Sequence, residues 1–442
     1  MWCAQVVKLN FMLKLAVIGT GYLGATHAAC LAKMGFEVIG VDNDENKIAT
    51  LSNGDLPFFE PTLPELLSEQ VKSGRLKFTS DYSEIADCDV HFICVGTPQV
   101  KDGLAADLTY ISSAFAAVSK VAKPGALLVG KSTVPVGTAQ KLSANLPSYL
   151  ELAWNPEFLR EGFAVEDTLH PNRLVVGVTS DRAEQILKEV YHQNLTEGTP
   201  WIRADLPTAE LVKVAANSFL ATKISFINAM AEICEAAGGD VTVLARAIGY
   251  DPRIGNRFLQ AGIGFGGGCL PKDIRAFMAR AEELGASQSL EFLREIDSIN
   301  SRARQRVIDV VRNELGMDLK SRKIAVLGAA FKPDSDDVRD SPALDIAAQL
   351  HAAGADVKIH DPKAIAPAKK RFPNLNFCEE IEACVKDSDL ILHLTEWKIY
   401  RELDPVKIKK LVNNASIIDG RNALDRESWR AAGWRFHGLG RA

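Results

Sequence analysis

The hydrophobic positions of the chain fall into short runs that end in polar or glycine-rich loops, a pattern typical of strands in a buried parallel sheet. The first run, residues 15–18, is followed by three spaced glycines, an alanine-rich stretch to Lys33 and a second run at residues 36–42. This order predicts a βαβ unit. Further buried strands are predicted at residues 90–95 and 126–130.

A long helix is predicted between Pro207 and Gly238, because no glycine or proline interrupts this stretch and small or apolar residues recur at helical spacing. Glu210, Lys213 and Asn217 would share one face of this helix. That face could line a site, or it could be an ordinary solvated face. A second helical region is predicted between residues 289 and 315.

The strand pattern restarts at residues 323–328 and continues at three later runs, residues 356–360, 389–393 and 415–419. The first turn of this second unit lacks the glycine spacing of the first, so we do not expect a second site for the same cofactor. The predicted fold class is therefore α/β, with two Rossmann-like doubly wound domains joined by a long central helix. The predicted boundaries are residues 1–11 for an N-terminal extension, 12–206 for the first domain, 207–318 for the central helical region and 319–442 for the second domain.

Composition excludes several classes of protein but does not indicate a reaction. A length of 442 residues predicts two or three domains, and 47% hydrophobic with 24% charged residues is typical of a globular protein. The net charge of -5 offers no basic surface for nucleic acid, and no apolar run is long enough to span a bilayer. The eight cysteines lack the paired spacing of a zinc site or a disulfide framework. We expect a cytoplasmic protein with no metal, nucleic-acid or membrane partner.

The first glycine turn has the spacing of a dinucleotide-binding fingerprint. Gly19, Gly21 and Gly24 stand between a predicted strand and a predicted helix, where they allow a tight turn and close approach of a pyrophosphate to the helix N-terminus. Asp42 follows about twenty residues later at the end of the second strand, where a carboxylate accepts the ribose hydroxyls. Because that carboxylate would repel a 2′-phosphate, the sequence favours NAD over NADP.

A second glycine-rich loop, residues 264–273, carries Cys269 together with Lys272 and Asp273. Glycines at this density lose backbone entropy on folding, which indicates close approach to a ligand or unusual backbone angles. A lone cysteine is ordinarily a small buried hydrophobe. Here the neighbouring charges could tune a thiolate, so Cys269 is a candidate nucleophile.

Taken in order, the motifs resemble those of the UDP-glucose/GDP-mannose dehydrogenase family of nucleotide-sugar 6-dehydrogenases, over nearly the whole chain from Met12. Two departures are Gly268, where many relatives carry serine, and the extension before Met12. The resemblance implies an NAD-binding first domain, a central dimerisation region that carries the Cys269 loop, and a UDP-sugar-binding last domain. It is carried by residues 19–24, 96–98, 131–138, 155–162, 210–228, 251–255, 264–273, 331–342 and 419–422.

The implied reaction is oxidation of a primary alcohol to a carboxylate in two hydride transfers. Cys269 would add to the intermediate aldehyde to give a thiohemiacetal, which the second oxidation converts to a thioester. Lys213 and Asn217 would stabilise the alkoxide and oxyanion charge, and Asp273 would assist through a water. The first general base stays open between Asp273 acting through water and Lys213.

The resemblance also assigns the hydrolysis and the ligand contacts. Glu157 would serve thioester hydrolysis, and Thr133 would position the water. The implied cofactor-binding residues are Gly19, Gly21, Tyr22, Leu23, Gly24, Asp42, Lys47, Thr97, Ser132, Thr133, Glu161 and Arg339. The implied substrate-binding residues are Glu157, Phe158, Leu159, Arg160, Lys213, Asn217, Arg253, Phe258, Gly266, Lys332 and Arg421. Arg253 is expected to complete the site of a neighbouring subunit, so the predicted assembly is a homodimer.

Three alternatives remain at this point. The runs at residues 251–255 and 270–273 favour UDP-glucose as the substrate, but GDP-mannose or a UDP-N-acetylhexosamine stays open. A non-catalytic NAD-binding regulator would have lost catalytic positions, yet all of those named above are present. A simple two-electron hydroxyacid dehydrogenase would leave the thiol of Cys269 without a role.

Overall fold

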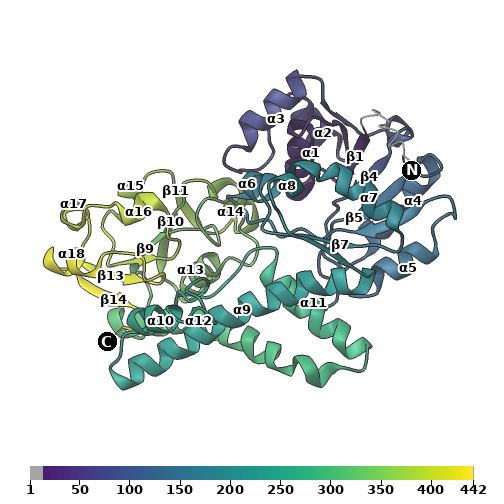
Figure 1. Cartoon of the computed structure of the whole chain (residues 1–442). Helices are drawn as coiled ribbons and strands as arrows, with labels where there is room; N and C mark the ends of the chain where they lie inside the picture. Colours follow the sequence, from purple (N-terminus) through teal and green to yellow (C-terminus); the bar gives the residue numbers. More distant parts are fainter. Residues whose placement is uncertain (1–12, 442) are drawn as a thin grey trace. The chain divides into compact units, whose positions relative to one another are not determined.

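The fold is described from a computed structural model, which describes residues 13–441 (Figure 1). The predicted extension, residues 1–11, lies outside this range. The chain divides into two compact units, Met1–Lys213 and Val214–Ala442. The division falls inside one continuous helix, α9 (Leu206–Ala237), which confirms the long helix predicted from the sequence.

The first unit is built on an eight-stranded sheet with the strand order β3-β2-β1-β4-β5-β6-β7-β8. All neighbouring strands run parallel except β6 and β7, which pair antiparallel through Trp154 and Gly177. The predicted strands of the first domain correspond to β1, β2, β4 and β5. The strands are β1 (Lys14–Ile18), β2 (Glu37–Val41), β3 (Leu76–Thr79), β4 (Val90–Ile93), β5 (Leu127–Gly130), β6 (Glu151–Trp154), β7 (Leu174–Gly177) and β8 (Trp201–Ala204).

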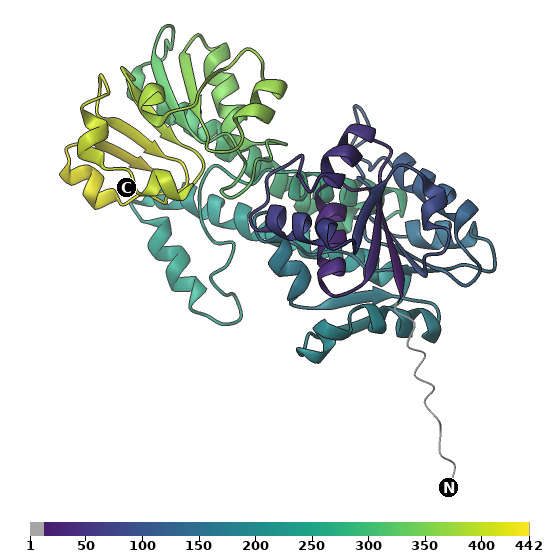
Figure 2. The same ribbon diagram turned by 90° about the horizontal axis from the view of Figure 1, so that it is seen from above.

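Helices cover both faces of this sheet, and β1 shows why both faces are apolar (Figure 2). Leu15 and Val17 pack in one hydrophobic core, whereas Ala16 and Ile18 pack in the other. Successive side chains of a strand point to opposite faces, so a sheet buried on both sides requires a continuous apolar run. The remaining elements are α1 (Tyr22–Lys33), α2 (Glu45–Ser52), α3 (Leu63–Lys72), a 3-10 turn (Tyr82–Ile85), α4 (Thr109–Val121), α5 (Thr138–Ala144), α6 (Ala164–Leu169), α7 (Asp181–Val190) and α8 (His192–Thr196).

The second unit holds a six-stranded sheet with the order β11-β10-β9-β12-β13-β14, in which every pair is parallel. The doubly wound second domain is therefore confirmed. Its strands are β9 (Lys323–Leu327), β10 (Asp356–His360), β11 (Asn376–Cys378), β12 (Leu390–His393), β13 (Ser416–Asp419) and β14 (Arg435–Gly438). Its helices are α10 (Val241–Gly249), α11 (Leu270–Glu283), a 3-10 turn (Ser287–Leu290), α12 (Glu291–Leu315), α13 (Pro342–Ala352), α14 (Ile365–Arg371), α15 (Ile381–Val385), α16 (Lys398–Arg401), α17 (Pro405–Lys409) and α18 (Arg426–Ala431).

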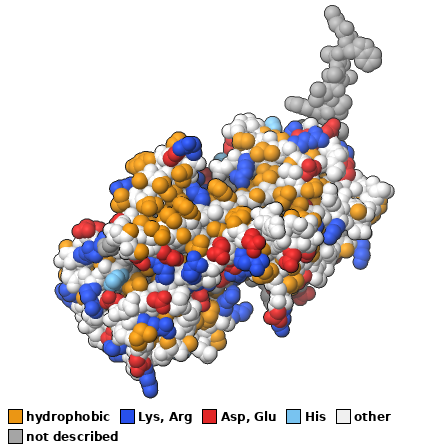
Figure 3. Space-filling view, turned by 90° about the horizontal axis from the view of Figure 1, so that it is seen from below, with side chains coloured by type: hydrophobic (Ala, Val, Ile, Leu, Met, Phe, Trp, Pro, Cys, Tyr) orange, Lys and Arg blue, Asp and Glu red, His pale blue; other side chains and the backbone are white. Residues whose placement is uncertain are grey.

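The surface mixes charges of both signs with hydrophobic side chains on the face drawn in Figure 3. Within residues 13–441, no helix is both long and apolar enough to cross a lipid bilayer. In the first unit, the loops after β1, β4, β5 and β6 follow the carboxyl ends of the strands. Open parallel sheets bind their ligands at this edge, so the candidate site is sought there.

Candidate active site

The turn between β1 and α1 has the geometry that a dinucleotide needs. Gly19 has a positive φ of 85°, and a Cβ on Gly24 would lie 1.8 Å from the carbonyl oxygen of Gly19, so neither position accepts a side chain. At Gly21 nothing lies within 4 Å of the place where a Cβ would stand. The N-terminus of α1 is thus approachable at this residue, and the chain fits the pyrophosphate of NAD.

Asp42 stands directly after β2 and is tied to this turn. Its carboxylate accepts hydrogen bonds from the Thr20 backbone N–H and from the Lys47 Nζ, both at 2.8 Å. Burial alone would raise the pKa of the Asp42 carboxyl, but the hydrogen bonds from Lys47 and the backbone outweigh it and lower that pKa. Asp42 is therefore ionised at neutral pH and can accept the ribose hydroxyls of NAD.

Replacing Asp42 by asparagine should weaken the preference for NAD. Loss of the charge-assisted bonds to the ribose should raise the KM for NAD roughly tenfold, and loss of the repulsion should improve use of NADP. The measurement is kcat/KM with each cofactor. Asp55→Asn, which changes an exposed aspartate, is the matched control. An unchanged ratio of the two kcat/KM values in Asp42→Asn would contradict the assigned role.

Two side-chain hydrogen bonds fasten the loops that follow β4 and β5. The Thr97 hydroxyl donates to the carbonyl oxygen of Thr133 at 2.7 Å, and the Ser132 hydroxyl donates to the carbonyl oxygen of Val95 at 2.6 Å. Thr97 and Ser132 are both buried. The backbone that carries Thr133 is therefore held in place by the two residues predicted to line the cofactor.

The loop after β6 brings four predicted site residues together. Lys213 Nζ lies 2.9 Å from Glu157 Oε1, and the other carboxylate oxygen of Glu157 accepts the backbone N–H of Leu159 at 2.8 Å. The Lys213 Nζ also lies 5.7 Å from the centroid of the Phe158 ring, whose face is covered by the Arg173 guanidinium at 3.9 Å. Lys213 and Glu157 are both largely buried, so their charges interact with little screening by solvent.

Two other predicted site residues, one in this loop and one at the start of α1, have protein partners that the sequence did not indicate. Arg160 makes a bidentate ion pair with Asp167, with nitrogen to oxygen distances of 2.6 and 2.8 Å. Tyr22 donates its hydroxyl proton to Glu60, which is 1% exposed and also accepts the backbone N–H of Gly162 at 2.6 Å. Glu60 was missed because it stands among apolar residues in a loop to which the sequence analysis assigned no motif. It anchors the segment next to Glu161.

In the second unit, Cys269 is exposed and occupies the N-cap position of α11. One turn further, Asp273 is 2% exposed and accepts hydrogen bonds from Asn217 Nδ2 and Lys272 Nζ, both at 2.6 Å. The structure therefore joins Asn217 of α9 to the helix that begins at the thiol. The N-terminus of a helix carries partial positive charge, which favours negative charge on the sulfur.

The glycines before Cys269 make room for a neighbouring segment of the chain. A Cβ on Gly266 would lie 2.2 Å from the carbonyl oxygen of Asp340, and one on Gly268 would lie 2.2 Å from the Arg339 guanidinium carbon. Arg339, predicted to contact the cofactor, thus lies against the loop of the thiol and is paired with Asp337 at 2.8 Å. A serine at position 268 would require the Arg339 side chain to shift.

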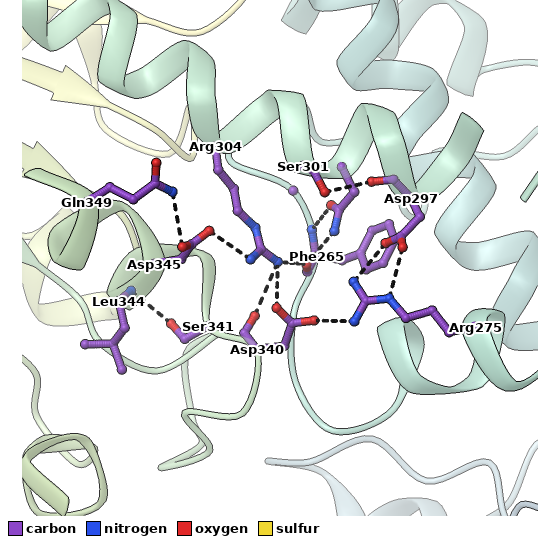
Figure 4. A network of polar contacts seen from close by, with 12 residues as sticks. Phe265, Arg275, Asp297, Ser301, Arg304, Asp340, Ser341, Leu344, Asp345 and Gln349 are labelled. Carbon is purple, nitrogen blue, oxygen red and sulfur yellow. Dashed lines mark hydrogen bonds and ion pairs between the residues drawn. The ribbon is translucent and has the colours of Figure 1, made fainter. Parts of the chain in front are cut away.

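A network of partly buried polar contacts holds this loop, and none of it was predicted (Figure 4). Arg304 reaches the Asp340 and Asp345 carboxylates, each at 3.1 Å, and donates to the carbonyl oxygen of Phe265. Arg275 pairs with both Asp297 and Asp340, at 2.9 and 3.4 Å. Because carboxylates surround each guanidinium, ion pairs and hydrogen bonds hold the segment before Cys269 against the segment after Arg339.

The remaining predicted substrate residues differ in their surroundings. Arg421 donates to the carbonyl oxygens of Leu394 and Phe331, each at 2.8 Å, and of Gly264 at 3.1 Å. The Lys332 Nζ lies 5.6 Å from the Phe331 ring centroid. Arg253 has a side chain that is 87% exposed and pairs with Asp251, and Phe258 adopts a positive φ of 63°. Contact of these residues with a substrate stays a prediction.

Residues 13–441 contain no group of three or more His, Cys, Asp or Glu side chains that could hold a metal ion. The predicted site residues offer an exposed thiol, a buried ammonium group, carboxylates and an amide. This set can stabilise oxyanions, form a covalent adduct with a carbonyl carbon and move protons.

Comparison with known proteins covers the chain almost end to end. The NAD binding domain model of the UDP-glucose/GDP-mannose dehydrogenase family matches residues 13–195, its central domain matches 207–302 and its UDP binding domain matches 325–426. UDP-glucose 6-dehydrogenase TuaD of Bacillus subtilis is 43% identical over 97% of this chain and 94% of that protein. UDP-glucose 6-dehydrogenase of Rickettsia felis is 40% identical over 97% and 96%.

The solved structures that are similar to this chain include dehydrogenases of the same kind as the sequence relatives. The structure of a UDP-glucose dehydrogenase from the archaeon Pyrobaculum islandicum has a TM-score of 0.89 and 34% identity, over 99% of this chain and 100% of that chain. A UDP-D-ManNAc dehydrogenase from Pyrococcus horikoshii has a TM-score of 0.85 and 27% identity, over 97% and 99%. The resemblance inferred from the motifs is confirmed: the chain belongs to the UDP-glucose/GDP-mannose dehydrogenase family, as an NAD-dependent oxidoreductase with a UDP-binding domain.

Proposed function

We propose that this protein is a cytoplasmic UDP-glucose 6-dehydrogenase that oxidises the sugar C6 alcohol of UDP-glucose to the carboxylate of UDP-glucuronate. The observation that carries the proposal is the exposed Cys269 at the N-terminus of α11, one turn before a buried Asp273 bound by Asn217. An exposed thiol at a helix N-terminus is suited to nucleophilic attack on an aldehyde. The UDP-glucose 6-dehydrogenases among its relatives support the choice of sugar.

The reaction consists of two oxidations, in each of which NAD, when bound, supplies the hydride acceptor. In the first, Lys213 or a water held by Asp273 takes the hydroxyl proton, and Lys213 and Asn217 stabilise the alkoxide. Cys269 then adds to the aldehyde carbon, which gives a tetrahedral thiohemiacetal that the second oxidation converts to a thioester. Glu157 and Thr133 serve hydrolysis of that thioester.

The test is the amount of NADH formed per sugar consumed. UDP-glucose, GDP-mannose and UDP-N-acetylglucosamine are each supplied with NAD, and NADH and the sugar product are quantified. We expect about two NADH per UDP-glucose, as four-electron oxidation through a thioester requires. One NADH with release of free aldehyde would overturn the mechanism, a preference for another sugar would overturn the substrate, and no NADH with any sugar would favour the non-catalytic regulator.

We also propose a homodimer built on α9, with Arg253 completing the site of the neighbouring subunit. Phe219, Phe226 and Ile233 recur every seven residues on this helix and are 66%, 47% and 61% exposed. Large apolar side chains in such a row are costly in water and are typical of a helix that packs against another subunit. The exposed Arg253 side chain is consistent with a contact outside its own subunit.

Phe226→Glu should therefore dissociate the dimer. A carboxylate in the middle of an apolar contact is buried without a partner, which opposes association. The measurement is the molar mass by light scattering across a concentration series, compared with Tyr110→Glu, which changes another exposed aromatic residue, on α4. A Phe226→Glu protein with the same mass as Tyr110→Glu and the wild type at all concentrations would contradict this interface.

A further inference from the structure

Lys131 is a buried cation in the first unit to which none of the proposed steps gives a role. It follows β5 directly and is 6% exposed. Its Nζ donates to Asn155 Oδ1 at 2.9 Å and to the Tyr191 hydroxyl oxygen at 3.4 Å, and it lies 5.9 Å from the ring centroids of Phe92 and Tyr191. Burying an ammonium is unfavourable unless it is well paired, so a lysine here calls for an explanation.

The position of Lys131 links two loops that serve the same step. On one side it immediately precedes Ser132 and Thr133, the latter predicted to position water. On the other side it donates a hydrogen bond to Asn155. Asn155 in turn donates its backbone N–H to the carbonyl oxygen of Gly130 and its Nδ2 to the carbonyl oxygen of Val175, each at 2.8 Å. A single proline, with its restricted backbone, separates Asn155 from Glu157. The backbone of Glu157 is thus fixed through Asn155.

Lys131 and Glu157 also line one cavity of about 80 Å³ in the first unit. Among the other lining residues are His27, Asp167 and Arg173. The buried His27 Nε2 has no hydrogen-bond partner among residues 13–441, and a buried polar atom in such a position normally binds water. The cavity has room for more than one water molecule, so it can hold water beside the carboxylate of Glu157.

We propose that Lys131 is a positioning residue for thioester hydrolysis: through Asn155 it holds the Glu157 segment, and its positive charge attracts the carboxylate of Glu157, which accepts a proton from water. In this step the water oxygen bonds to the acyl carbon, the carbon–sulfur bond breaks and Cys269 leaves as thiolate. One water proton passes to Glu157, and the acid releases the other to solvent. The inference rests on the proposed function, because hydrolysis is needed only if a thioester forms.

The surroundings of Lys131 give the step a distinctive pH dependence. Burial lowers the pKa of Lys131 to about 8. The groups that face it are Glu157, His27 of α1, Cys94 after β4 and Tyr191 after α7. Burial lowers the pKa of His27 well below its usual range. Burial raises the pKa of Cys94 to about 12 and also raises the pKa of Tyr191. Lys131 is positively charged at neutral pH and loses its charge as the pH rises through about 8, so hydrolysis should slow over that range.

The test compares Lys131→Met with Lys131→Arg, and Lys120→Met serves as the control for loss of an exposed lysine. Each protein is mixed with NAD and UDP-glucose, the NADH formed in the first turnover is followed, and the sugar adduct on the denatured protein is weighed by mass spectrometry. For Lys131→Met we expect a near-normal first burst of two NADH, a roughly 100-fold slower steady state, and accumulation of the adduct. Lys131→Arg should recover most of the turnover.

The pH profile of adduct decay separates this role from a merely structural one. The wild-type decay should slow as the pH rises through about 8, whereas Lys131→Arg should show no such decline because the guanidinium does not titrate there. The inference is overturned if the burst and the steady state of Lys131→Met fall together without adduct, or if Lys131→Arg keeps the wild-type decline. If the wild type forms fewer than two NADH per sugar, the proposed function fails instead.

Discussion

Cys269→Ser is expected to lose steady-state oxidation of UDP-glucose by a factor on the order of a thousand or more, as removal of an enzyme nucleophile typically does. A serine hydroxyl at the N-cap of α11 preserves the local shape but is a far weaker nucleophile than a thiolate. The measurement is NADH formation under saturating substrates, combined with direct binding of NAD and UDP-glucose, both of which should persist.

The matched control for this variant is Cys378→Ser, which replaces another cysteine that is not fully buried. That variant should keep normal turnover, because Cys378 lies at the end of β11. Two NADH per sugar at the wild-type rate from Cys269→Ser would refute the covalent route.

Lys213→Met should lower kcat roughly 100- to 1,000-fold and leave the KM for UDP-glucose within a few-fold of the wild type. The ammonium lies 2.9 Å from the Glu157 carboxylate in a buried setting, so its removal withdraws a positive charge from the developing oxyanion and leaves Glu157 without that ion-pair partner. The measurement is the steady-state rate across a series of substrate concentrations.

The control is Lys120→Met, which removes a lysine at the exposed end of α4 and should behave as the wild type. Because Lys213→Met could also disturb folding, its binding of NAD should be checked first. A kcat within about twofold of the wild type would mean that Lys213 stabilises no charge that develops during reaction.

The sequence predicted the elements with long or continuous apolar runs. Strands β1, β4 and β9 and the helix α9 were found because their side chains are buried on two faces or recur at helical spacing. The sequence analysis did not predict the strands β3, β6, β7, β8, β11 and β14. Strands β3 and β8 have few buried residues, whereas β7 is buried but only four residues long. The antiparallel pairing of β6 with β7 was also not predicted, because the sequence of a short strand does not indicate its direction in the sheet.

Some residues of the candidate site could likewise be predicted from the sequence, and others could not. The helical spacing of Lys213 and Asn217 correctly placed two buried polar residues on one face of α9. Glu210 shares that face but accepts the backbone N–H groups of Gly137 and Ala139, at 2.7 and 2.6 Å, and so fixes the start of α5. Lys131 could not be singled out, because burial of its charge depends on Asn155 and Tyr191, which are distant along the chain.

The buried ammonium of Lys131 also bears on how this fold could be made more heat-resistant. A lysine whose pKa falls from 10.5 to about 8 on folding lowers the free energy of unfolding at neutral pH by roughly 3 kcal/mol. This penalty is present below pH 8 and is relieved as the pH rises toward 10.5, since the unfolded chain then binds more protons than the native protein. Selection for thermal stability alone would therefore favour an uncharged side chain at this position.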